Sequence, residues 1–160
     1  MIQLTVYGVA LPQGSKSARV VKGRAILTEG FGDGPRRRKA WRDAVADAAR
    51  EWQKTHNAAL LEGPLRFEAW FYLPRPKSAP KRVAMPAKKP DASKLLRSVE
   101  DALTGIIWHD DAQIVTAHVF KRFALFCPPH AVLRIGRVEE VGEDCATTPA
   151  QREAEETEDA

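Results

Sequence analysis

The amino-acid sequence predicts an α/β fold, in which a small mixed β-sheet of about four or five strands packs against two main helices. Segments with apolar residues at every second position predict strands, and segments with an apolar stripe at helical spacing predict helices. They follow one another in the order β-α-β-α-β-β, which is typical of helices packed over a mixed sheet. A chain of 160 residues is long enough for one such domain and too short for two.

The first third of the chain predicts a strand, an irregular connection and a long helix. Residues 2–7 alternate between apolar and mainly polar side chains, which predicts a half-buried strand. The glycine-rich residues 11–34 predict a loop or an irregular hairpin. From Pro35, which suits a first helical turn, apolar residues recur every three or four positions, so a helix ending near residues 56–59 is expected.

A second strand and a basic loop follow. Residues 65–73 alternate strictly between apolar and other side chains, which predicts a strand. Residues 74–90 contain five prolines, six basic residues and no acidic residue. Because proline removes backbone donors and breaks both helix and sheet, we expect an exposed loop here.

The remaining elements are a second helix and two strands. An apolar stripe predicts a helix over residues 93–104, with Ser93 as its N-cap and Gly105 as its C-terminal stop. Residues 113–124 and 131–138 then predict the last two strands.

Composition excludes several classes of protein. With 44% apolar and 29% charged residues the chain is typical of soluble globular domains. No apolar run approaches the roughly 20 residues needed to span a bilayer, and the N-terminus lacks the basic region of a signal peptide, so we expect a cytoplasmic location. Cys127 and Cys145 are too few and too far apart for a zinc site or a disulfide framework, which indicates two unpaired thiols.

Charge is distributed very unevenly along the chain. Residues 139–160 hold nine acidic residues and one basic residue, Arg152, and few apolar residues, so we expect this tail to be largely disordered. Residues 1–138 hold 24 of the 25 basic and 12 of the 21 acidic residues, a net charge of +12. A body this basic favours nucleic acid as a partner, although a merely soluble basic surface is the alternative.

Acidic residues gather in one segment of this basic body, namely Asp91, Glu100, Asp101, Asp110 and Asp111. A helix over residues 93–104 carries the chain about 17 Å away from Asp91, and an extended segment 105–111 could return roughly 23 Å. The chain therefore has the reach to bring Asp110 and Asp111 back beside Asp91. Clustered carboxylates suit a hard divalent cation such as Mg²⁺, whereas the alternative is that Asp110 and Asp111 are solvated residues of a turn.

The segment KPDASKLLRSVEDALTGIIWHDDAQI, residues 89–114, resembles the signature of the RusA family of Holliday junction resolvases from phages and prophages. That signature reads Asp-x-Asp-Asn/Lys-Leu-x-Lys/Arg, then Asp-Ala-Leu-x-Gly, then Asp-Asp-x-Gln-Val/Ile. PQGSK at residues 12–16, a basic helix start and a strand before the motif also resemble phage members. The similarity covers about residues 1–138, a nuclease domain, and leaves the acidic tail 139–160 outside.

The resemblance implies a homodimer of small α/β subunits that uses Mg²⁺, or Mn²⁺ as a substitute, to make symmetric nicks across a four-way DNA junction. It implies Asp91 and Asp111 as catalytic, metal-binding residues, with Asp110 as a neighbouring ligand. Arg97 takes the position of a basic residue that would stabilise developing negative charge. Ser93 replaces the second aspartate of Asp-x-Asp, and a hydroxyl is a weaker ligand that could cap the helix instead. Two functions therefore stay open: an active resolvase, or a catalytically weakened or inactive junction-binding protein of the same fold.

Several neighbours of these residues have two interpretations. Asp101 could pair with Arg97 on one helix face, or could hold Arg97 near the metal. Like Ser93 and Asp101, Gln113 is a candidate for a supporting role around the metal, because it fits the family signature. His109 could be a general base or a solvated histidine, and Trp108 a core or interface residue.

Basic residues form candidate phosphate contacts. Four of them occupy the start of the first predicted helix, where the helix dipole disfavours each cation by about 0.3–1 kcal/mol, so phosphate binding explains them better than helix stability. A solvated charge run is the alternative. We expect branched DNA and a second copy of the chain as partners, and neither a membrane nor a small-molecule substrate. The candidate DNA-binding residues are Lys16, Arg36, Arg37, Arg38, Lys39, Arg75, Lys77, Lys81, Arg82, Lys88, Lys89, Lys94 and Lys121, with Arg122 beside the last.

Overall fold

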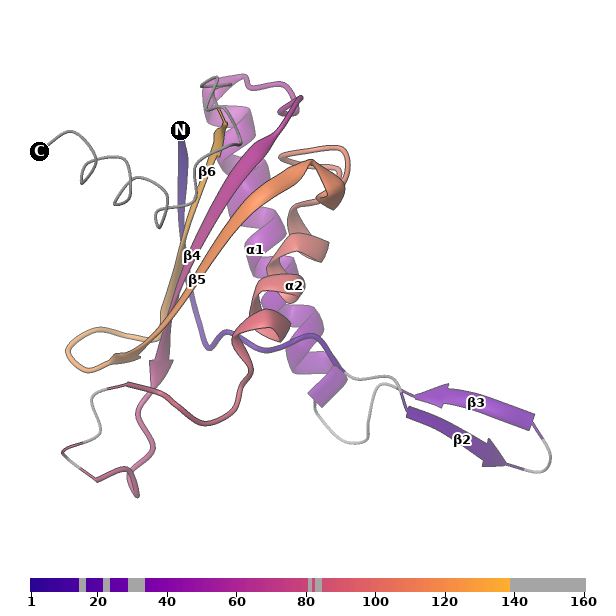
Figure 1. Cartoon of the computed structure of the whole chain (residues 1–160), viewed down its shortest axis with the longest axis vertical. Coiled ribbons are helices and arrows are strands. Elements are labelled where there is room, and N and C mark those ends of the chain that lie inside the picture. Colours follow the sequence, from indigo (N-terminus) through magenta and orange to yellow (C-terminus); the bar gives the residue numbers. More distant parts are fainter. Residues whose placement is uncertain (15–16, 22–23, 29–33, 81, 83–84, 139–160) are drawn as a thin grey trace, which may run out of the picture.

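Two helices pack on one side of a four-stranded mixed sheet in the computed structural model of the chain, which confirms the predicted fold class (Figure 1). The structure describes residues 1–14, 17–21, 24–28, 34–80, 82 and 85–138. The acidic tail 139–160, and with it Cys145, lies outside the described residues. The elements are β1 (Ile2–Tyr7), β2 (Ser17–Val21), β3 (Arg24–Thr28), α1 (Gly34–His56), β4 (Leu65–Pro74), α2 (Ala92–Leu103), the 3₁₀ turn η1 (Asp111–Gln113), β5 (Ile114–Ala124) and β6 (His130–Arg137).

The strand order of the main sheet decides where each end of α2 lies. The order is β1-β6-β4-β5, in which β6 runs antiparallel to β1 and β4, while β4 and β5 are parallel. Since α2 connects the two parallel strands, it runs back along the sheet from the end of β4 to the start of β5. The start of α2 therefore faces the end of the sheet where β4 finishes, and its end faces the end where β5 begins (Figure 1).

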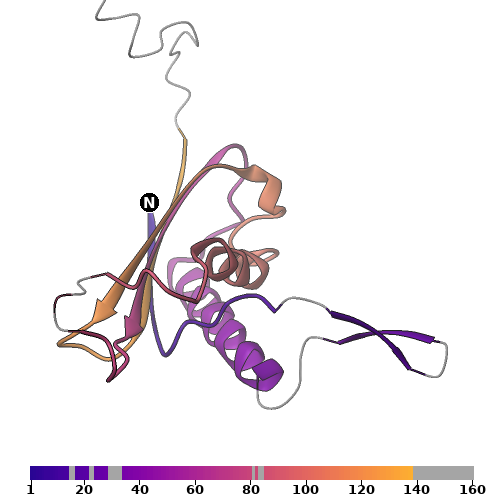
Figure 2. The same ribbon diagram turned by 60° about the horizontal axis from the view of Figure 1, so that its bottom comes forward.

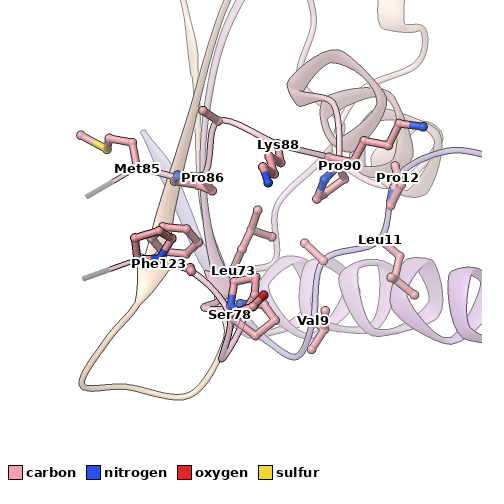
Figure 3. Close-up of a pocket in the computed structure, with 17 residues that line it drawn as sticks. Val9, Leu11, Pro12, Leu73, Ser78, Met85, Pro86, Lys88, Pro90 and Phe123 are labelled. Atoms are coloured by element: carbon pink, nitrogen blue, oxygen red, sulfur yellow. The ribbon is translucent and has the colours of Figure 1, made fainter. Parts of the chain in front are cut away.

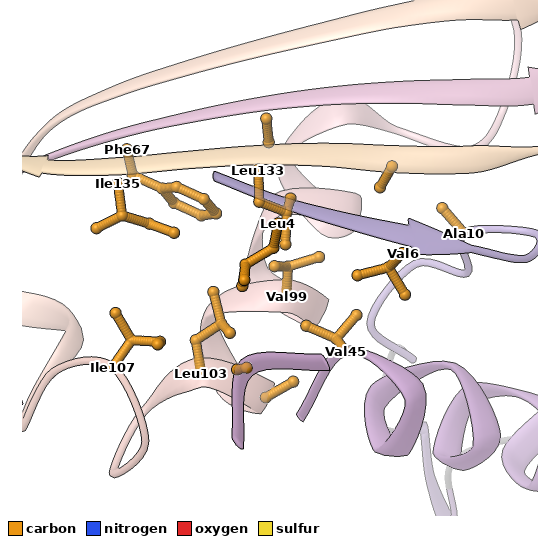
Figure 4. Close-up of a cluster of buried hydrophobic side chains, with 14 of the residues drawn as sticks. Leu4, Val6, Ala10, Val45, Phe67, Val99, Leu103, Ile107, Leu133 and Ile135 are labelled. Carbon is orange, nitrogen blue, oxygen red and sulfur yellow. The ribbon is translucent and has the colours of Figure 1, made fainter. Parts of the chain in front are cut away.

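The core lies between the sheet and the two helices. Alternate residues of β4 are buried, including Phe67 and Phe71, and α2 contributes Leu95, Val99 and Leu103 from one helical face. Figure 4 shows side chains of the sheet and the helices meeting in this layer. Both helices lie on the same side of the sheet in two views (Figures 1 and 2), so only one face of the sheet is covered by a described helix.

The glycine-rich connection predicted as a loop or irregular hairpin is a hairpin in its described part. β2 and β3 pair antiparallel from Ser17 with Thr28 to Val21 with Arg24, as a separate two-stranded sheet. Figures 1 and 2 place this hairpin away from the main sheet.

The predicted N-cap of the second helix is wrong by two residues. Asp91 is the N-cap of α2, with extended backbone angles of −70° and 138°, and Ser93 lies inside the first turn. The predicted stop is confirmed, because Gly105 has a φ of 77°, a left-handed conformation that favours glycine. Its backbone N–H donates to the carbonyl of Trp108 at 2.7 Å, so the chain turns at the end of α2.

None of the helices in the described residues has the length and apolar character that crossing a membrane requires.

Candidate active site and DNA-binding surface

The expected proximity of Asp91 to Asp110 and Asp111 is wrong within one chain. Asp91 precedes the first residue of α2, whereas the carboxylate of Asp111 accepts a hydrogen bond from the hydroxyl of Thr104, directly after the last residue. The twelve residues between them rise about 17 Å. The turn at Gly105 keeps segment 105–111 at the C-terminal end of the helix. The chain runs back toward the start of α2 only along β5.

Asp111 is held by two donors at the C-terminal end of α2. Its Oδ1 accepts a hydrogen bond from Trp108 Nε1 at 2.9 Å and a short one from the Thr104 hydroxyl. Trp108 is fully buried and lies 5.6 Å from the Phe67 ring, so the indole that orients the carboxylate is itself fixed in the core. No described residue donates to Oδ2, which leaves that oxygen available to a ligand.

Hydrogen bonds of the Gln113 side chain stabilise the turn that contains Asp110 and Asp111. Its Oε1 accepts hydrogen bonds from the backbone N–H groups of His109 and Asp110 at 2.9 and 3.1 Å. Its Nε2 donates to the carbonyl of Leu61 at 3.0 Å, in the connection between α1 and β4. Asp110 caps η1 by accepting from the N–H of Ala112 at 2.8 Å. Asp110 thus helps to form the turn, while His109 is exposed.

Glu100 is the acidic neighbour of Asp111. Burial raises the pKa of the Glu100 carboxyl, and the negative charges of Asp111 and Asp101 raise it further, while Arg97 lowers it. A carboxylate that another carboxylate makes harder to ionise is a group that a bound cation would stabilise. Sequence reasoning counted Glu100 among the acids but gave it no role, although its spacing of four residues before Thr104 places both on one face of the helix.

Asp101 does not form the expected ion pair with Arg97. Its carboxylate lies 3.9 Å from Arg42 of α1, so in the described part of the chain it ties the two helices together. Arg97 remains exposed and close enough to Glu100 to influence its pKa.

The carboxylates that lie near Asp111 differ from the expected set of metal ligands. In the described residues, no group of three or more His, Cys, Asp and Glu side chains is arranged to hold a metal ion. Mg²⁺ is commonly held by one or two carboxylates, with water and substrate phosphate completing its shell. Asp111 and Glu100, whose charges interact, are two candidate carboxylates of this kind, whereas Asp91 of the same subunit lies at the other end of α2. The metal-binding role of each aspartate stays a prediction.

The other end of α2 gathers basic residues. A hollow of about 430 Å³ is lined by Arg38 of α1, Lys89 of the proline-rich loop, and Asp91 and Lys94 at the start of α2. Lys94 Nζ lies 3.7 Å from the Asp91 carboxylate. Arg38, which is distant in the sequence, thus joins Lys89 and Lys94 around one predicted catalytic aspartate.

The remaining basic candidates fall into three groups. Arg36, Arg37, Lys77, Arg82 and Lys88 are exposed, and Lys39 is exposed but lies 2.6 Å from Asp43. Lys16 and Lys81 lie outside the described residues. Arg75, Lys121 and Arg122 contact the protein itself.

Lys121 holds the proline-rich loop in place. Its ammonium donates to the carbonyls of Lys88 and Pro90 at 3.0 and 2.9 Å, so it positions the residues just before Asp91. The loop also packs onto the domain around an apolar cavity of about 510 Å³, in which Phe123 and Leu73 of the sheet face residues such as Pro86 (Figure 3). The loop is therefore exposed along most of its described length but anchored at Pro86.

Comparison with known proteins identifies the family. A family model described as "Endodeoxyribonuclease RusA" matches residues 12–135, which is more than half of the chain. The chain belongs to the RusA endodeoxyribonuclease family. A relative named "Uncharacterized protein YqaN", from Bacillus subtilis (strain 168), is 28% identical over 133 residues, which cover 77% of this chain and 88% of that protein.

Membership of the RusA family confirms the resemblance drawn from residues 89–114. At the level of the family it indicates an endodeoxyribonuclease that resolves Holliday junctions, and hence branched DNA as the nucleic acid it binds. In this RusA-family chain the residues that sequence reasoning missed are Thr104 and Glu100, together with the indole donor of Trp108. Trp108 was expected in the core or an interface, and its core position is confirmed.

Proposed function

We propose that the protein is a divalent-cation-dependent, structure-selective endonuclease that cuts four-way DNA junctions by two symmetric nicks, acting as a homodimer in the cytoplasm. The observation that carries the proposal is the oriented carboxylate of Asp111 beside Glu100, in a chain of the RusA family. A two-fold dimer matches a two-fold junction, so each subunit would cut one strand of a symmetric pair.

Mg²⁺, or Mn²⁺ as a substitute, is the proposed cofactor. Asp111 and Glu100 would hold it, with Asp110 close by in the same turn. A bound Mg²⁺ polarises a phosphate and lowers the pKa of a bound water. Trp108 and Thr104 would keep Asp111 in one orientation. The Arg97 guanidinium would stabilise the negative charge that develops on the phosphate.

Asp91 has a separate role in this proposal. It lies beside Arg38, Lys89 and Lys94 at the other end of α2, where the basic residues would hold the DNA backbone. We therefore assign Asp91 to the positioning of the bound strand, outside the coordination sphere that contains Asp111 of the same subunit.

An inactive or weakened junction-binding protein is the second candidate. Two observations favour it: Ser93 occupies a position where the family signature has an acid, and the described residues contain no group of three metal-binding side chains. This candidate predicts salt-sensitive junction binding without cation-dependent cleavage.

The deciding experiment uses a synthetic four-way junction and a linear duplex of the same arm sequence, each incubated with purified full-length protein with and without Mg²⁺. The proposed function requires paired nicks in the junction only when Mg²⁺ is present, and little cutting of the duplex. Junction binding without nicks at any Mg²⁺ or Mn²⁺ concentration would favour the second candidate.

A further inference from the structure

An apolar cavity of about 510 Å³ lies between the proline-rich loop and the main sheet (Figure 3). Leu73 of β4 and Phe123 of β5 form its floor, and they are register partners at the ends of the two parallel strands. Loop residues such as Pro86 face them across the cavity. A cavity of this size is within the range of small-ligand sites in proteins. The proposed cation site makes no use of it.

Hydrogen bonds hold the loop side of the cavity in place. Arg75 Nη2 donates to the carbonyl of Pro80 at 2.7 Å. The Lys121 ammonium donates to the carbonyls of Lys88 and Pro90 at 3.0 and 2.9 Å. The walls of the cavity are therefore ordered without a ligand, which reduces the entropy that binding costs.

The chemistry of the cavity suits a flat, uncharged ring. Six of the described residues that line it are prolines, and none of those described residues is acidic. Ser78 and Lys88 supply polar groups on opposite sides of the cavity (Figure 3). Apolar walls with a few polar groups are typical of a site that packs on the faces of a ring and binds its edge. A nucleobase has this chemistry, since every base has a π-face and a hydrogen-bonding edge.

The cavity shares a wall with the basic hollow at the start of α2. Pro12, Lys89 and Pro90 line both spaces. The hollow, which Arg38 and Lys94 also line, is the proposed contact for the DNA backbone. Because the two spaces adjoin, a nucleotide whose phosphate lies in the hollow has its base within reach of the cavity.

We propose that the cavity binds one unpaired base of branched DNA whose phosphate backbone lies in the adjacent hollow. This inference rests on the proposed function, because branched DNA supplies the base. In a linear duplex, a base enters the cavity only after its pairing and its stacking on both neighbours are broken. Beside a branch point that cost is smaller, because stacking is already interrupted there. The cavity would therefore favour a junction over a duplex, which phosphate contacts alone do not do.

The charge around the cavity favours nucleic acid over a free apolar molecule. Lys88 and Lys89 line the cavity and are exposed, and residues 74–90 contain six basic residues and no acidic residue. A free apolar ligand gains nothing from these charges, whereas the nucleotides on either side of a bound base carry phosphates. A free ligand and a protein segment are alternative outcomes of the test.

The test is a thermodynamic cycle that combines a filled cavity with a missing base. Full-length protein is titrated in EDTA with four-way junctions in which each nucleotide beside the branch is replaced in turn by an abasic site, so that binding is measured without cleavage. Ala79→Phe and Ala87→Phe fill the cavity, and Ala87 is exposed, so its substitution disturbs the fold least. Ala59→Phe, at an exposed residue between α1 and β4, is the matched control. Circular dichroism and thermal unfolding establish which variants fold.

The expected result is that the wild type and Ala59→Phe lose about tenfold in affinity when one particular base is removed, the change typical of one stacked base. The filled variants should bind the intact junction about as weakly, and should lose little more when the same base is removed. Wild-type affinity that no abasic site changes would overturn the inference. Folded filled variants that bind the intact junction like the wild type would assign the cavity to a free ligand or a protein segment, and would overturn it as well.

Nicking is measured separately, in Mg²⁺. A coupled cycle for a wild type that makes no nick supports the base site and contradicts the proposed cleavage. Nicks from a wild type whose cycle shows no coupling leave the proposed function standing without the base site.

Discussion

At the scale of single residues, the two oxygens of Asp111 have different surroundings. Trp108 and Thr104 fix Oδ1, and no described donor reaches Oδ2, so one oxygen sets the orientation of the carboxylate and the other can bind a ligand. The buried indole makes this orientation part of the core rather than of a flexible surface.

Asparagine substitutions should separate the two aspartates. Asp111→Asn and Asp91→Asn should each lose most junction cleavage while retaining junction binding, because neither removes a basic side chain that binds phosphate. Mg²⁺ should raise the melting temperature of the free protein, since a ligand of the folded state stabilises it. Asp111→Asn and Glu100→Gln should lose this rise, whereas Asp91→Asn should keep it. Thermal unfolding with Mg²⁺ or with EDTA measures this, and Asp47→Asn on the exposed face of α1 is the control. Loss of the Mg²⁺ effect in Asp91→Asn alone would contradict the proposed site.

The raised pKa of Glu100 has a consequence for stability. The folded state binds this proton more tightly than the unfolded state, whose pKa is near 4.5, so the contribution of Glu100 to stability is complete below pH 4.5 and is lost as the pH rises through the folded pKa. Without divalent cations, Glu100→Gln should therefore gain stability over the wild type between pH 4 and pH 8. Urea unfolding in EDTA at both pH values checks the sign. An equal difference at the two pH values would show that the carboxyl is not perturbed; Glu62→Gln, an exposed residue, is the control.

Ser93 offers a test of where the cation binds. Since Asp91 is the N-cap, Ser93→Ala should change the free energy of unfolding by less than about 0.5 kcal/mol. Ser93→Asp adds an acid to the first turn of α2 and should stabilise it by about 0.3–1 kcal/mol. Because Ser93 and Asp111 lie at opposite ends of α2, Ser93→Asp should leave the Mg²⁺ concentration for half-maximal cleavage unchanged. A clear decrease would instead locate the cation beside Asp91.

At the scale of elements, the two ends of α2 have different proposed roles, DNA binding at its start and cation binding at its end. Its start lies among basic residues from α1 and the proline-rich loop, and its end carries the acidic pair. Lys121 and Gln113 hold the connections that lead into and out of this unit, through hydrogen bonds to backbone groups. The helix thereby fixes the spacing between the proposed DNA-binding hollow and the proposed cation.

The start of α1 should bind phosphate groups of the DNA. Arg36 and Arg37 are exposed in its first turn, which contains no acidic residue. Replacing both by Ala should weaken junction binding and reduce the slope of log affinity against log salt concentration by about 0.9 for every phosphate that the variant no longer neutralises. Arg50→Ala is the control, because Arg50 lies late in the same helix and pairs with Asp47 at 2.9 Å. Equal salt slopes for the wild type and the double variant would mean that the pair faces solvent.

At the scale of the whole molecule, the sequence predicted the helices and strands better than it predicted the distances between the candidate site residues. Strict alternation in residues 65–73 and the apolar stripe of Leu95 and Val99 depend on local periodicity, and both elements are confirmed. The position of Asp111 depends on the β4-α2-β5 crossover, in which β5, and not segment 105–111, carries the chain back along α2. A left-handed glycine at position 105 is compatible with either path, so only the tertiary structure places Asp111 beside Thr104 and Glu100.

In the proposed mechanism, cleavage depends on a cation held by Glu100 and Asp111 at the end of α2. The most direct measurement is the rate of symmetric nicking of a four-way junction by Glu100→Gln and by wild type, across a Mg²⁺ titration at saturating protein. The proposed site predicts that Glu100→Gln binds the junction like the wild type but needs at least tenfold more Mg²⁺ for half-maximal nicking, or makes no nicks. Nicking by Glu100→Gln with the wild-type rate and Mg²⁺ dependence would contradict it.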